Sequence, residues 1–75
     1  MKETKIVKVI NEQGGKTYIT EAGSYIKRTR SSFSVYDSNP QGPHKSIHFD
    51  ILPDGSLRIN EKGIGEVIVP AYVFK

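Results

Sequence analysis

The clearest alternation of apolar and polar positions lies in residues 46–60, on both sides of the turn sequence Pro53-Asp54-Gly55. The apolar positions of the two flanking runs are Ile47, Phe49, Ile51, Leu57 and Ile59. A period of two residues is typical of strands with one buried face. The turn sequence suits a three-residue hairpin loop, because proline holds φ near about −65° and glycine tolerates the left-handed conformation of the bulge position.

The length of this loop determines which residues lie opposite one another. A two-residue turn at Asp54-Gly55 would place Ile51 opposite Arg58 and mix the buried and exposed faces, which a half-buried sheet does not tolerate. The three-residue loop keeps the faces apart. It predicts the pairs Ile51 with Leu57, Phe49 with Ile59, Asp50 with Arg58 and His48 with Asn60.

Other short runs rich in Ile, Val, Thr, Tyr and Phe are separated by glycine or proline and predict further strands. These runs are residues 4–10, 16–20, 24–36 and 64–69. The run 24–36 contains no Gly or Pro, and it forms either one long bent strand or two pieces that meet near Ser31 and Ser32. If the strand is continuous, Arg28 and Arg30 share a face with Tyr36.

No window keeps a helical apolar period for three turns. Helix is therefore limited to about one short turn, near residues 11–13 or at the C-terminal 70–74, where Tyr72, Val73 and Phe74 are expected to close the core. No linker or repeat divides the chain. We expect one all-β domain, 1–75, with five or six antiparallel strands in a meander or partly open barrel.

Seventy-five residues bury only about 60–65% of the surface that the unfolded chain exposes, so the stability margin is small. The chain has no cysteine and two histidines, which leaves no disulfide framework and too few ligands for a structural zinc site. We expect no metal and no cofactor.

Lys5 and Lys8 interrupt the N-terminal apolar run, and no stretch approaches a membrane span. These features predict a cytoplasmic protein with no membrane contact.

The net charge of +3 is a mild excess, and basic residues cluster only in residues 27–30, "KRTR". Arginines on a sheet face beside an aromatic ring are typical of RNA or single-stranded DNA binding, since the cations bind phosphates and the rings stack on bases. The candidate residues for this function are Arg28, Arg30, Tyr36 and Arg58, with Lys27 and Lys45 at the rim. The alternative interpretation is the solvated face of a half-exposed sheet.

Two other functions remain open. A protein-interaction module, or a homodimer, would use the loop 37–45 or an edge strand. A metal-independent, ribonuclease-like enzyme would use His48, but a single imidazole on a strand is more often a surface residue. His44 and His48 lack a third metal ligand with defined spacing. We assign no catalytic residue and favour a non-enzymatic binding module.

Overall fold

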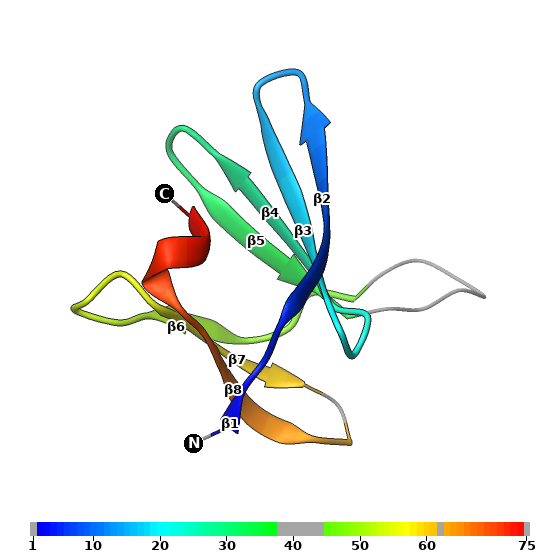
Figure 1. Cartoon of the computed structure of the whole chain (residues 1–75), viewed down its shortest axis with the longest axis vertical. Coiled ribbons are helices and arrows are strands. Elements are labelled where there is room, and N and C mark those ends of the chain that lie inside the picture. The colour runs from blue at the N-terminus through cyan, green and yellow to red at the C-terminus, as the bar shows by residue number, and fades with distance from the viewer. Residues whose placement is uncertain (1, 38–44, 62, 75) are drawn as a thin grey trace.

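A computed structural model describes residues 2–37, 45–61 and 63–74. It confirms the all-β class: these residues form eight strands in two four-stranded sheets, together with one 3₁₀ helix, Ala71–Phe74 (Figure 1). One sheet has the order β2-β3-β4-β5, formed by Ile6–Glu12, Gly15–Thr20, Tyr25–Thr29 and Phe33–Tyr36. The other has the order β1-β8-β7-β6, formed by Lys2–Glu3, Gly65–Val69, Leu57–Glu61 and Phe49–Ile51. Within the described residues, no helix is long and apolar enough to cross a membrane.

The two sheets join along two sides and enclose a shared interior. On one side the chain passes from β1 into β2, where the Thr4 amide donates to the Ile68 carbonyl at 2.9 Å. On the other side Tyr36 bridges to Ser46. The first and last strands, β1 and β8, are parallel neighbours, while the other described strand pairs are antiparallel. The expected meander therefore curls into a partly closed barrel. Its strand count is higher than expected because the run 24–36 is divided in two and a short strand, β1, precedes the run 4–10.

The hairpin of β6 and β7 has the predicted register. Ile51 pairs with Leu57, Phe49 with Ile59 and Asp50 with Arg58. The loop closes by two bonds, from the Leu52 amide to the Ser56 carbonyl at 2.8 Å and from the Gly55 amide to the Leu52 carbonyl at 2.9 Å. Gly55 has φ +91°, the left-handed conformation that the bulge position requires.

The run 24–36 is two strands, β4 and β5, joined by a turn that the Thr29 amide closes on the Ser32 carbonyl at 2.9 Å. The turn resets the alternation, and Arg28 pairs with Phe33 whereas Tyr25 pairs with Tyr36. Arg28 therefore lies on the opposite face of the sheet from Tyr36.

The core is formed by both sheets and by the C-terminal helix. Its buried apolar residues are Tyr18, Ile26, Val35, Leu57, Ile59, Val67, Val69 and Phe74. The Phe74 ring meets the rings of Tyr18 and Phe33 edge-on, with centroids 5.1 and 5.2 Å away.

The helical turn predicted at the C-terminus is confirmed, but the alternative at residues 11–13 is wrong, since that segment belongs to β2 and its turn. Tyr72 is 70% exposed and does not close the core.

Candidate nucleic-acid interface

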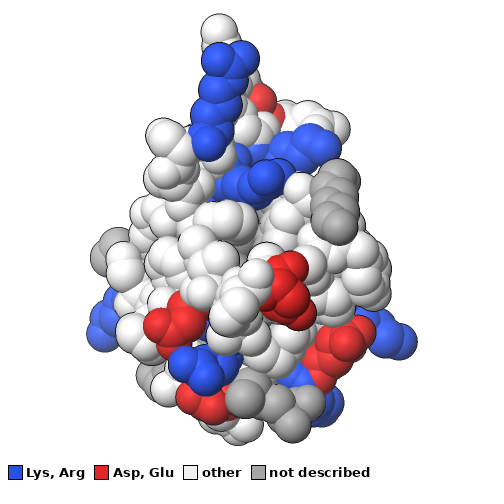
Figure 2. Space-filling model, turned by 90° about the vertical axis from the view of Figure 1, so that its left-hand side faces the viewer, with Lys and Arg blue, Asp and Glu red and all other residues white. Residues whose placement is uncertain are grey.

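An open groove of about 810 Å³ lies at the tips of the β2–β3 and β4–β5 hairpins. Three basic residues line it, Lys16, Arg28 and Arg30, together with one carboxylate, Glu12. We call this surface the basic groove. In Figure 2 the charged side chains on the upper part of the molecule are mainly basic, with a small acidic patch beside them, whereas acidic and basic side chains are mixed on the lower part. The groove is therefore a local concentration of positive charge on a mildly basic protein.

The register of the sheet explains why these cations lie together. Tyr18 pairs with Ile26 inside the core, and two residues further along both strands Lys16 pairs with Arg28 on the same face. The face of the sheet that packs into the core therefore extends past the core, and there its side chains are basic. The edge-on packing of Phe74 against Tyr18 marks the end of the apolar part.

Arg28 also contributes to the fold. Its Nη1 donates a 2.6 Å hydrogen bond to the carbonyl of Phe74, at the end of the 3₁₀ helix. Its guanidinium carbon lies 5.8 Å from the centre of the Phe33 ring, a cation–π distance. A guanidinium has five N–H donors, so this one bond leaves capacity to bind a phosphate oxygen.

Gly15 allows β3 and β4 to approach closely beneath the groove. A Cβ atom at this position would overlap the backbone carbonyl oxygen of Arg28. The sequence alone does not indicate this close approach. Nor does it indicate Lys16 as a site residue, because the position of Lys16 opposite Arg28 depends on the tight turn at residues 13–14.

The other predicted binding residues lie elsewhere. Lys27 and Tyr36 line a second groove, of about 440 Å³, on the outer face of the same sheet, where Tyr25 also lies. Lys45 is exposed and lines a third hollow, of about 330 Å³. Arg58 is on β7, in the other sheet. The structure therefore brings Arg28 and Arg30 together with Lys16, and it separates them from the remaining four.

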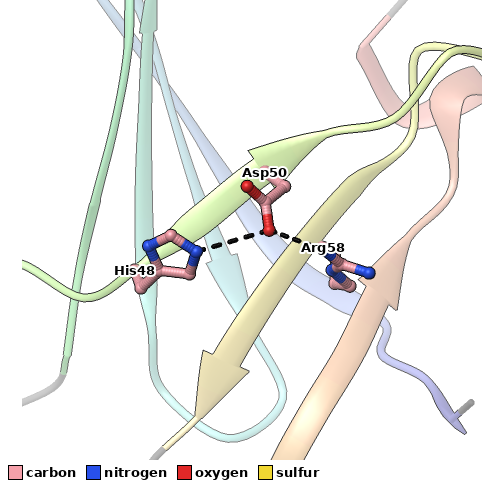
Figure 3. Close-up of polar contacts among 3 residues, drawn as sticks. All are labelled: His48, Asp50 and Arg58. Atoms are coloured by element: carbon pink, nitrogen blue, oxygen red, sulfur yellow. Dashed lines mark hydrogen bonds and ion pairs between the residues drawn. The ribbon is translucent and has the colours of Figure 1, made fainter.

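His48, Asp50 and Arg58 form an exposed ion-pair cluster (Figure 3). One oxygen of Asp50, Oδ2, lies 3.3 Å from His48 Nε2 and 2.7 Å from Arg58 Nη2. The hydrogen bond from Arg58 lowers the pKa of Asp50, and the nearby His48 lowers it further, while Asp50 raises the pKa of Arg58. The His48 side chain is 78% exposed. Solvent therefore screens these charges strongly, and the cluster is a surface network around one shared carboxylate.

Glu61 is a buried acid at the other end of the barrel, only 3% exposed. Its Oε1 has no hydrogen-bond partner among the described residues, and it borders a water-sized cavity of about 20 Å³. Burial raises the pKa of Glu61, although hydrogen bonds with Thr20 and Ser24 oppose the shift, and the charge of Glu21 adds to it.

The substitution Glu61→Gln is expected to raise the melting temperature at pH 7 by a few degrees. Below the ordinary pKa of 4.5 the carboxyl is protonated in both states, so its ionisation does not reduce stability there. As the pH rises from there to the higher pKa of the folded state, the folded protein retains a proton that the unfolded chain has lost, and the free energy of unfolding falls. Glutamine is neutral throughout and removes this decline.

Thermal unfolding of both proteins between about pH 4 and pH 8 measures this effect. Glu21→Gln, at an exposed neighbouring position, is the matched control and is expected to change the pH profile much less. A Glu61→Gln protein that is less stable than the wild type at pH 7, with the pH dependence unchanged, would contradict the assignment.

Within the described residues, no three His, Cys, Asp or Glu side chains lie close enough together to hold a metal ion. His44 and most of the loop 37–45 lie outside the described residues, so the histidine pair and the loop considered from the sequence stay predictions.

No protein-family model matches the chain, and no curated protein or solved structure shows significant similarity to it.

Proposed function

We propose that this protein is a non-enzymatic binding module whose basic groove holds the phosphate backbone of single-stranded RNA or DNA. The observation that carries the proposal is the convergence of Lys16, Arg28 and Arg30 on one concave surface with a single carboxylate, Glu12. Sites for single strands combine a positively charged groove that tracks the backbone with aromatic rings that stack on bases, and this groove provides the first of these two features. The location proposed with it is the cytoplasm, on the basis of the cysteine-free sequence.

The composition of the groove indicates how it would bind. Tyr18 lies at its edge but is only 3% exposed, so its ring cannot stack on a base. Tyr25 and Tyr36 border the separate outer groove. Phosphate contacts would then supply most of the affinity, with strong salt dependence and little preference for base sequence.

Binding of a fluorescently labelled single strand, followed by anisotropy at several salt concentrations, tests the proposal. Three phosphate contacts predict a slope of log K against log salt of about −2, because each contact to a single strand contributes about −0.7. Lys16→Ala and Arg30→Ala are each expected to weaken binding several-fold and to reduce the slope by about one contact. Arg28 is not substituted, since it also bonds the Phe74 carbonyl.

Two lysine variants serve as matched controls. Lys5→Ala removes the same charge at an exposed position that does not line the groove, and it is expected to change binding little. Lys27→Ala removes a cation from the outer groove. Equal losses in all four variants would indicate non-specific attraction, and a loss confined to Lys27→Ala would move the site to the outer face. Absence of binding at low salt would overturn the proposal.

An interaction module that uses an edge strand is the second candidate. It is favoured by one observation: β2 exposes Val7 and Val9, with 63% and 46% of their surfaces in solvent. Apolar side chains on the edge of a sheet are typical of strands that pair with another chain.

A further inference from the structure

Strand β2 has one edge without a partner in the described part of the chain. It is seven residues long and lies at the end of its sheet, where it pairs with β3. The edge of the other terminal strand, β5, is different, since Tyr36 bridges to Ser46 and the Val35 carbonyl accepts from the Ile47 amide. A long edge with exposed Val7 and Val9 carries free backbone donors and acceptors beside apolar surface.

The hydrogen-bond pattern shows which residues of β2 direct their backbone groups outward. The Thr20 amide donates to the Ser24 carbonyl at 3.0 Å, so the backbone amide and carbonyl of Thr20 point to the side of β3 on which β4 lies. Along an antiparallel strand this direction alternates, and every second residue of β3 therefore turns toward β2. These residues are Ile19, Thr17 and Gly15, whose partners are Lys8, Ile10 and Glu12. The residues between them, Val9 and Asn11, direct their amides and carbonyls to the free edge.

We propose that β2 pairs antiparallel with β2 of a second copy of this chain, about a two-fold axis at Ile10. Val9 then lies opposite Asn11 of the second copy, and the two exchange backbone hydrogen bonds. Lys8 lies opposite Glu12 of the second copy, and the symmetry repeats this pair of opposite charges. The strand is therefore complementary to itself in both backbone and charge.

Other registers lose this complementarity. An axis at Lys8 places two lysines directly opposite each other, which is destabilising. An axis at Val9 places Lys8 opposite Ile10 and leaves its charge unpaired. The axis at Ile10 matches each Lys8 with a Glu12 and packs the two Ile10 side chains against each other.

The pairing joins the two β2–β5 sheets into one of eight strands. The axis is perpendicular to the joined sheet, so the basic grooves of both copies open on the same side. A single pair of edge strands forms a small interface, and the dimer is therefore weak and depends on protein concentration. The inference does not depend on nucleic-acid binding.

Sedimentation analysis of the unlabelled protein across micromolar to millimolar concentrations tests this dimer. The wild type is expected to shift from monomer to dimer over this range. Lys8→Glu replaces two attractive pairs by two repulsive ones and is expected to weaken association by about tenfold. The double variant Lys8→Glu/Glu12→Lys reverses both charges, restores the pairs and is expected to recover the wild-type association.

Two further variants separate charge from backbone pairing. Val9→Pro removes an amide that points outward, so it is expected to block the dimer while leaving the β2–β3 bonds in place. Lys5→Glu changes the charge equally outside β2 and is expected to leave association unchanged. Circular dichroism and thermal unfolding of each variant verify the fold, and the charge variants decide the matter if the proline variant does not fold.

Recovery of association in the double variant would establish the register at Ile10. A wild type that stays monomeric to about 1 mM would overturn the proposal, because even weak edge pairing is populated at that concentration. A dimer that both Lys8→Glu and Val9→Pro leave intact would also overturn it, since a different surface would then be responsible. Loss in Lys8→Glu without recovery in the double variant would reject this register.

Discussion

Replacement of Phe74 by alanine is expected to lower the free energy of unfolding by about 3–5 kcal/mol, the usual cost of removing a buried phenyl ring. Phe74 is 7% exposed and its ring meets Tyr18 and Phe33 edge-on. It also holds the 3₁₀ helix over the end of the barrel next to the basic groove. A domain of 75 residues has about 4–11 kcal/mol of stability in total, so this single change brings it close to unfolding.

Urea or thermal unfolding of the Phe74→Ala protein measures this loss. Tyr72→Ala is the matched control, because Tyr72 belongs to the same helix but is 70% exposed, and a change within about 0.5 kcal/mol is expected there. Phe74→Leu keeps most of the apolar volume and is expected to cost less than the alanine variant. Similar stabilities for the Phe74→Ala and Tyr72→Ala proteins would show that the helix does not close the core.

Gly15→Ala is expected to cost about 1–3 kcal/mol and to distort the basic groove. The new Cβ would overlap the Arg28 carbonyl oxygen, which belongs to the neighbouring strand and cannot rotate away as a side chain would. Either β3 or β4 must shift, and the shift moves Lys16 relative to Arg28. Because both residues line the groove, binding of a single strand is expected to weaken together with stability.

Gly14→Ala separates this clash from backbone strain. Gly14 has φ +87° and no atom within 4 Å of an added Cβ, so alanine there meets conformational strain alone. Thermal unfolding compares the two losses, and amide NMR shifts report whether β4 moves. Shifts at Lys16 and Arg28 are expected in the Gly15→Ala protein and not in the Gly14→Ala protein. A Gly15→Ala protein in which neither β3 nor β4 moves would contradict the close approach described for these strands.

The β6–β7 hairpin shows what local pattern can predict. Its alternating apolar residues and the loop at Pro53, Asp54 and Gly55 identify one register, and the structure has that register. The information is contained within about 15 consecutive residues, where turn geometry and strand period restrict each other. The C-terminal helical turn after Pro70 is similarly local.

The candidate site was only partly accessible from the sequence. Their clustering in the sequence indicates Arg28 and Arg30. The face of the sheet on which they lie depends on whether residues 24–36 form one bent strand or two strands joined by a turn. The turn between β4 and β5 places Arg28 opposite Phe33, away from Tyr36. Lys16 lies beside them because β3 pairs with β4 and places Lys16 opposite Arg28. The run 16–20 taken alone does not show which strand it pairs with or in which register.

Local pattern was enough to establish the all-β class and the central hairpin, because strand period and turn chemistry are properties of neighbouring residues. The composition was enough to establish that no disulfide stabilises the fold, since the chain has no cysteine. The three-dimensional arrangement was needed to learn which cations share a groove, that Arg28 also supports the C-terminal helix, and that Glu61 is buried. Each of these depends on the register between strands that are distant in sequence, and a shift of one residue in that register would move every side chain to the opposite face.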